Sequence, residues 1–121
     1  MSGDPYSPVV RELFAAPAHV GDVEDGVTAS VDDQGIRLQL SARVTGAGIE
    51  AMRFRAWGCP HLIAAAEWLC GYYEGRQISA LEDFPRAPIM EHLAIPMEKT
   101  GRILVLEDTV RLLGQKFGDG S

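Results

Sequence analysis

The stretch from Met52 to Tyr73 changes its hydrophobic period abruptly, and this change most constrains what the chain can fold into. Up to Trp57, apolar residues alternate with arginines, a pattern typical of a half-buried strand. After a Gly-Cys-Pro corner the chain is almost continuously apolar to Tyr73, which predicts a central helix. Cys59 therefore lies at the start of a helix, where free backbone N–H groups and the helix dipole favour the thiolate over the thiol.

The rest of the pattern predicts two further strands and several helices. Alternation predicts strands over 27–31 and 36–44 with a hairpin turn at 32–35, and a turn at 45–48 leads into the strand that ends at Cys59. Short helices are expected after Ser7 and over 79–82, and apolar residues at steps of three and four predict a last helix over 100–117. The expected fold class is α+β, a three-stranded antiparallel sheet with helices packed on one face.

Length and composition predict one domain and exclude some partners. A chain of 121 residues with 46% hydrophobic content can bury one core, so we expect a single domain over 1–121 with disorder at 1–5 and 118–121. The net charge of −6, without a basic run, argues against a nucleic acid or an anionic membrane as partner. No apolar segment approaches the roughly 20 residues of a membrane span, and no signal peptide is recognisable, so we expect a cytoplasmic protein.

The two cysteines have different interpretations. They are separated by about 16 Å if both lie on one helix, which is too far for a disulfide. Cys70 lies within the apolar run and is expected in the core. Cys59 is either a small buried residue at a tight junction or a reactive thiol. Together with His61 it gives only a weak metal signal, because the spaced Cys/His sets typical of zinc sites are missing from the sequence.

The other polar residues have ordinary structural interpretations. His19 is expected to be an exposed or capping histidine rather than a ligand, and His92 to lie at the surface. Asp32 and Asp33 are expected to form the hairpin turn. The sequence contains neither a Gly-rich phosphate loop nor a Gly-x-Ser-x-Gly elbow, so nothing in it supports a hydrolase or a nucleotide-dependent enzyme.

Several segments together resemble the IscU/NifU-type iron-sulfur cluster assembly scaffolds over nearly the whole chain. No gap is needed between Cys59 and Asp108, which makes the resemblance more specific than any single motif. It implies the SufE/NifU-like α+β fold, in agreement with the fold inferred from periodicity. The segments that carry it are Tyr6–Val10, Pro17–Gly21, Arg53–Cys59, Ile63–Ala66, Leu93–Lys99 and Leu106–Asp108.

The resemblance implies a protein that builds a [2Fe-2S] cluster on three cysteines, helped by an aspartate or histidine, with sulfur from a cysteine desulfurase. Only the second of those cysteines is present here, as Cys59. The first falls at or near Asp32, its accompanying aspartate near Gln34 or at Asp33, and the histidine-cysteine pair before the last helix on Gly101 and Arg102. Two of the three thiolates are therefore replaced.

We accordingly expect a divergent scaffold-like protein, not an enzyme, that binds iron weakly or acts through protein contacts centred on Cys59. Its expected partner is a cysteine desulfurase or another iron-sulfur assembly protein. Iron, zinc or a labile [2Fe-2S] cluster would be held by Cys59 and Asp32, with Asp33 and His61 as further metal ligands and Gly101 and Arg102 in the same pocket.

Two alternatives stay open. In the first, Cys59 is a sulfur acceptor that carries a persulfide from a cysteine desulfurase. In the second, the chain is a non-catalytic binding module that regulates the same system. Arg102 bears on all of them, because a guanidinium at that position would repel Fe2+ and could instead pair with Asp32 or Asp33 or stabilise a Cys59 thiolate.

Overall fold

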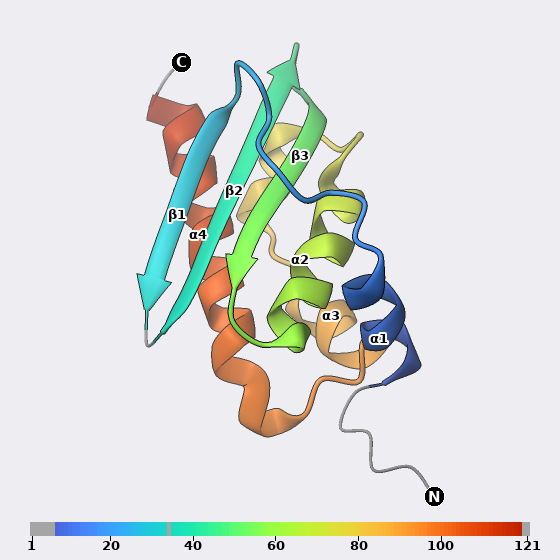
Figure 1. Ribbon diagram of the computed structural model, residues 1–121. Coiled ribbons are helices and arrows are strands. Elements are labelled where there is room, and N and C mark those ends of the chain that lie inside the picture. Colours follow the sequence, from blue (N-terminus) through green and yellow to red (C-terminus); the bar gives the residue numbers. More distant parts are fainter. Residues whose placement is uncertain (1–6, 34, 120–121) are drawn as a thin grey trace, which may run out of the picture.

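A three-stranded antiparallel sheet with strand order β1-β2-β3 carries helices on one face (Figure 1). This computed structural model describes residues 7–33 and 35–119. The predicted α+β fold class is confirmed. The strands are β1 (Val27–Asp33), β2 (Ile36–Thr45) and β3 (Gly48–Trp57), and the helices are α1 (Pro8–Ala15), α2 (Pro60–Tyr73), α3 (Arg86–His92) and α4 (Thr100–Asp119), with short 3-10 helices η1 (Ile78–Glu82) and η2 (Met97–Lys99).

The alternation in β2 decides which face of the sheet the helices cover. Leu38 and Leu40 are fully buried. Arg37, which precedes Leu38 in the same strand, points to the other face and is exposed. Helix α2 packs against β3, and α4 packs against β1 and β2 (Figure 1). The segment between α1 and β1 first runs along the free edge of β3, where Val20 bridges to Phe54 in parallel, and then crosses the face of the sheet opposite the helices (Figure 1).

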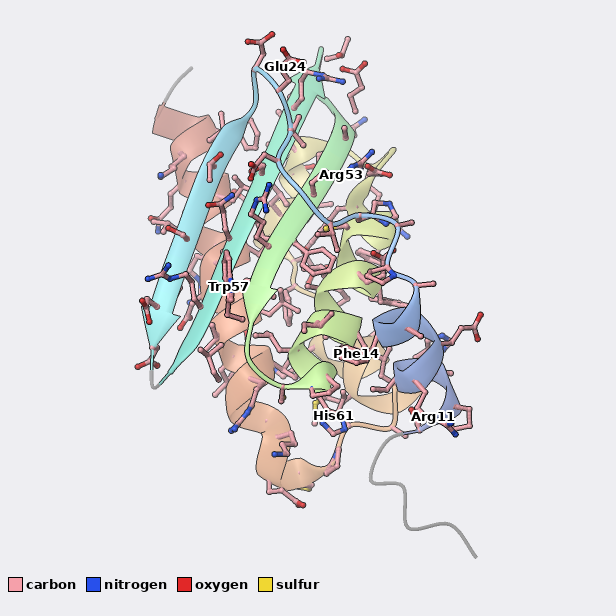
Figure 2. All side chains as sticks on the ribbon, in the orientation of Figure 1. Arg11, Phe14, Glu24, Arg53, Trp57 and His61 are labelled. Atoms are coloured by element: carbon pink, nitrogen blue, oxygen red, sulfur yellow. The ribbon has the colours of Figure 1, made fainter. Side chains whose placement is uncertain are left out.

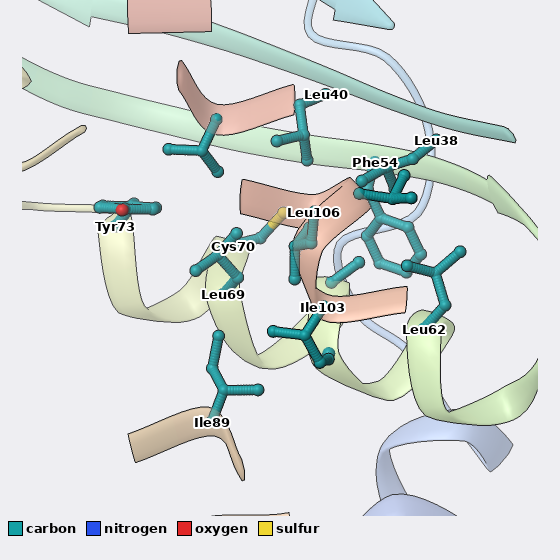
Figure 3. Close-up of a cluster of buried hydrophobic side chains, with 14 of the residues drawn as sticks. Leu38, Leu40, Phe54, Leu62, Leu69, Cys70, Tyr73, Ile89, Ile103 and Leu106 are labelled. Carbon is teal, nitrogen blue, oxygen red and sulfur yellow. The ribbon is translucent and has the colours of Figure 1, made fainter. Parts of the chain in front are cut away.

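The core lies between the sheet and helices α2 and α4 (Figure 3). The thiol of Cys70 lies within it at 0% exposure, which confirms the prediction of a core cysteine. Burial raises the pKa of this thiol well above its usual range. The largest side chains around it include Leu38, Leu40, Phe54, Leu62, Leu69, Tyr73, Ile89, Ile103 and Leu106.

The first hairpin is tighter than the sequence predicts. Asp32 pairs with Arg37 and Asp33 with Ile36 in the strand register, so β1 runs two residues beyond its predicted end. The prediction that both aspartates form the turn is therefore wrong. Gly35, with φ of +78°, adopts a left-handed conformation, and the chain reverses direction there and not at the aspartates. Because successive strand residues point to opposite faces, the two carboxylates diverge.

Helix α4 is slightly longer than predicted. It continues through Gly118 to Asp119, two residues beyond its predicted end. The predicted ion pair between Glu107 and Arg111 forms, with 3.2 Å between Nη2 and Oε2. Residues 1–5, for which we predict disorder, and residues 120–121 lie outside the described part of the chain. None of the described helices combines the length and apolar character needed to span a membrane.

Candidate functional site

Strand β3 delivers Cys59 to the N-terminus of α2. A Cβ at Gly58 would lie 3.3 Å from Leu62 Cδ2, a tight contact, and 3.7 Å from the side chain of Ile36, so the corner packs closely against the core, and its φ of +158° favours glycine. Cys59 is the N-cap residue of α2, with extended backbone angles, and Pro60 occupies the first helical position. The predicted junction between strand and helix is thus present at the predicted residues.

The Cys59 side chain is half-buried against the edge of the core and makes no capping hydrogen bond with α2. Oxygen side chains at this position normally accept a hydrogen bond from a backbone N–H in the first turn. The sulfur is not engaged in this way, although its backbone oxygen accepts the N–H of Leu62 at 3.0 Å. The geometry leaves a partly accessible thiol at a helix N-terminus.

His61 lies in the first turn of α2 and is only 1% exposed, near the end of the molecule that carries Cys59 (Figure 2). Burial lowers the pKa of its imidazole, and the charges of Lys99 and Arg102 lower it further against the opposing charge of Glu98. The ring is therefore neutral at neutral pH. Asp32 and Asp33 are exposed, so a metal ion bound to them would lie at the surface. The buried His61 ring does not reach that surface.

Asp32 and Asp33 lie on different faces of the sheet. Asp32 points to the face opposite the helices and pairs with Arg37, at 3.2 Å between Oδ2 and Nη2. Asp33 lines a pocket of about 260 Å³ together with Gly101 and Arg102. The structure thus brings Asp33, but not Asp32, to Gly101 and Arg102. The predicted pairing of Arg102 with Asp32 is wrong, because Arg37 is the cross-strand neighbour of that carboxylate.

The four predicted metal ligands do not converge. Within residues 7–33 and 35–119, no group of three or more His, Cys, Asp or Glu side chains is placed to hold a metal ion. Asp32 points to the far face and His61 is buried, so neither can join Cys59 and Asp33 at the surface. A [2Fe-2S] cluster takes four protein ligands, most of them thiolates. The described residues therefore offer no complete ligand set within one chain.

Sequence reasoning missed a charged cluster that ties the N-terminal segment to α2. His19 is half-buried rather than exposed, with Nδ1 2.5 Å from Glu67 Oε2 and Nε2 3.1 Å from Glu74 Oε1. Its backbone N–H also donates to Glu67 Oε1 at 2.8 Å. The two glutamates follow His19 by 48 and 55 residues, so no local pattern could reveal the contact. The sequence contains one indication of these contacts. Glu67 lies within an otherwise apolar helix and Glu74 follows directly after it, so both carboxylates need polar partners.

The same cluster holds Glu74 against β3. Its Oε2 accepts the backbone N–H of Met52 at 2.9 Å and pairs with Arg53. Burial raises the pKa of Glu74, but the hydrogen bonds from Met52, Arg53 and His19 outweigh burial and leave the pKa below its usual value. The Glu74 contacts therefore stabilise the fold at neutral pH, and this contribution is lost as the pH falls through the folded-state pKa.

His19→Ala should lower the free energy of unfolding by about 1–3 kcal/mol, because it leaves the buried Glu67 carboxylate without its side-chain partner. His19→Gln, which can still donate one hydrogen bond, should lose less. Urea unfolding measures both, and Val20→Ala, at a neighbouring side chain that is 52% exposed, is the matched control. A loss for His19→Ala no larger than for the control would contradict a stabilising cluster.

The model of the NifU-like N terminal domain family matches residues 5–113. The chain belongs to this family. The iron-sulfur cluster assembly scaffold protein IscU of Azotobacter vinelandii is 29% identical over 88% of this chain and 88% of its own length. The bifunctional protein NifU/MnmA of Rubrobacter xylanophilus is 31% identical over 96% of this chain, but the chain spans only 28% of that protein.

Solved structures agree with this NifU-like assignment. A candidate iron-sulfur cluster assembly scaffold protein for the SUF system from Fervidobacterium islandicum AW-1 superposes with a TM-score of 0.69, covering 90% of this chain and 96% of its own. Its sequence identity is 15%, so this likeness shows the fold. The predicted resemblance to the IscU/NifU-type scaffolds is confirmed at the level of family and fold.

Proposed function

We propose that this NifU-like domain serves iron-sulfur cluster assembly as a sulfur acceptor, with Cys59 as the acceptor and a cysteine desulfurase as the donor. The observation that carries the proposal is the state of Cys59, a half-buried thiol at a helix N-terminus whose sulfur makes no capping hydrogen bond. Sulfur transfer needs one such thiol. A resident cluster needs several thiolates, and the positions that resemble the other two carry Asp32 and Arg102.

The proposed reaction is an exchange between a thiol and a persulfide. The Cys59 thiolate attacks the terminal sulfur of the donor's cysteine persulfide, a new S–S bond forms at Cys59 Sγ, and the donor's S–S bond breaks. The leaving group is the donor's cysteine thiolate, which takes up the proton that Cys59 released. The oxidised sulfur passes from one protein to the other, so no further oxidant or reductant is needed.

Exposed apolar side chains near Cys59 support a protein donor. Trp57 precedes the cysteine by two residues and is 50% exposed, with the Arg37 guanidinium 5.7 Å from its ring centre. Met97 is 84% exposed and lies in η2. This short helix is close to the start of α2, because the charge of its Lys99 acts on His61. Large exposed apolar side chains are typical of protein interfaces. Iron binding by Cys59 with Asp32, Asp33 and His61 has less support, because those side chains do not converge.

Mass spectrometry of the native chain tests the proposal. After anaerobic incubation with a cysteine desulfurase and cysteine, then alkylation, we expect one added sulfur on the peptide that contains Cys59. Cys70 is an internal control, because it is 0% exposed and should stay unmodified. An unmodified Cys59 beside a desulfurase that carries its own persulfide would refute the acceptor role. If the two proteins still bound each other, the regulatory binding module would be favoured.

A further inference from the structure

The free edge of β1 carries backbone groups that the rest of the sheet does not use. Strand β1 lies at one side of the sheet, with only β2 as its neighbour (Figure 1). Lys116 of α4 donates to Thr28 O at 2.7 Å, so this carbonyl points away from β2. Because backbone groups alternate in direction along a strand, the N–H and C=O of Ser30 and Asp32 point outward as well. Within residues 7–33 and 35–119, Lys116 makes the only hydrogen bond to these outward groups.

The edge of β3 at the other side of the sheet is covered by the chain itself. Phe54 exchanges two backbone hydrogen bonds of 2.8 Å with residues 19–21. Ile49 likewise bonds residues 75 and 76, at 2.9 and 2.8 Å. Strand β1 has no such cover among the described residues. It runs over seven residues in an unbroken register with β2 and contains no proline, so its edge is a template for another strand.

The positions of charge along β1 favour a second copy of this strand, running antiparallel, as the added strand. Asp32 and Asp33 lie at the end of β1, and Asp33 forms no ion pair within the described part of the chain. Lys116 lies beside Thr28, at the start of β1. Two parallel copies would place like carboxylates side by side, which is unfavourable. Two antiparallel copies instead bring the carboxylates of one chain to the ammonium of the other.

We propose that two copies of this chain form a dimer through β1, which joins their sheets into one continuous sheet. In the register centred on Ser30, this residue pairs with its own counterpart, and Thr28 pairs with Asp32 of the second copy. The outward N–H and C=O groups of the two strands then bond each other. The dimer is independent of the proposed sulfur transfer, since its interface uses no atom of Cys59.

The same register gives Lys116 an anionic partner on the second copy. Odd-numbered positions of β1 face the helices, as the burial of Ala29 at 1% exposure shows. On that face, Asp33 of the second copy lies opposite Val27. It is therefore next to the Thr28 carbonyl that Lys116 contacts in the single chain. The two-fold symmetry repeats this ion pair at the other end of the interface.

Analytical ultracentrifugation of the full chain at increasing concentration tests the dimer. We expect the mass to rise from one chain to two, with weaker association at high salt. Ser30→Pro removes an outward N–H at the centre of the interface and keeps the bonds to β2, since proline fits an edge strand whose N–H faces solvent. This variant should stay monomeric where the wild type dimerises. Ser30→Ala keeps the N–H and is the matched control, so it should dimerise as the wild type does.

Charge reversal tests the register. Lys116→Glu should raise the dissociation constant of the dimer by about tenfold or more, because two attractions become two repulsions. Adding Asp33→Lys to that variant restores both ion pairs and should recover most of the affinity. Amide hydrogen exchange tests the same register without a substitution. The N–H groups of Thr28, Ser30 and Asp32 should become protected as the concentration of the wild type rises.

A chain that stays monomeric at millimolar concentration would overturn the proposal and leave the edge of β1 to a strand of another protein. A dimer that persists in a folded Ser30→Pro variant would place the interface elsewhere. If Lys116→Glu strengthened association, Lys116 would only protect the edge, and the proposed ion pair would be wrong. Cys59→Ser should dimerise as the wild type does, so failure of the dimer and failure of sulfur transfer are distinguishable.

Discussion

Cys59→Ser should abolish sulfur loading and at the same time raise the free energy of unfolding by about 0.5–1 kcal/mol. Serine is among the preferred N-cap residues, because its hydroxyl accepts a hydrogen bond from a first-turn N–H. Cys59 holds the N-cap position of α2 without making such a bond. The substitution therefore removes the nucleophile and adds a cap. Urea unfolding and mass spectrometry on the same preparation measure the two effects.

Cys59→Ala separates the cap from the thiol. It should also abolish sulfur loading, but without the gain in stability that serine gives. If serine at position 59 gives a more stable fold than the native cysteine, the cysteine is not there for stability, which indicates selection for the chemistry of the thiol. If Cys59→Ser were instead less stable than the wild type by more than about 1 kcal/mol, the sulfur would act mainly as a packing group, and the functional interpretation of Cys59 would lose its support.

Phe54→Ala should lower the free energy of unfolding by about 3–5 kcal/mol, the largest loss we expect from one side chain. Phe54 is 2% exposed and lies between the sheet and α2 (Figure 3), so its removal leaves a cavity that neighbouring side chains cannot fill completely. Its backbone bonds do not depend on the side chain, and the 2.8 Å bond from its N–H to His19 O should remain.

Arg55→Ala on the other face of β3 is the matched control for Phe54→Ala. Arg55 is exposed and pairs with Asp22 at 3.1 Å, a surface contact of the kind that contributes little to stability. Thermal or urea unfolding of the two variants compares a core and a surface side chain in adjacent positions of one strand. A loss below about 1 kcal/mol for Phe54→Ala would mean that this face of the sheet is not the packed face.

The fold could be predicted because its signals are local. Leu38 and Leu40 alternate with polar residues along a single strand, and the apolar run after Cys59 lies within a single helix. The faces of Asp32 and Asp33 could not be predicted in the same way. The hairpin closes at Gly35 instead of at the aspartates, and a difference of one residue decides which carboxylate faces the helices.

The candidate site was predictable only in part, for a related reason. The place of Cys59 follows from the corner itself. Asp33, Gly101 and Arg102 line one pocket, but Cys59, which we expected beside them, is not among its lining residues. The burial of His61 depends on tertiary packing, with the charges of Lys99 and Arg102 close enough to act on its ring, and no local pattern in the sequence records this. His19 shows the same limit, because its partner carboxylates are far away in the sequence.

Sulfur and iron measured on one sample give the most direct test of a single-thiol acceptor. The full chain is incubated anaerobically with a cysteine desulfurase, cysteine and Fe2+, then desalted, and Cys59 persulfide, iron and visible absorption are measured. We expect a persulfide on Cys59 with no iron retained. A desalted chain that holds iron and sulfide in equal numbers, with charge-transfer absorption and no Cys59 persulfide, would contradict the acceptor role and identify a scaffold that assembles its own cluster.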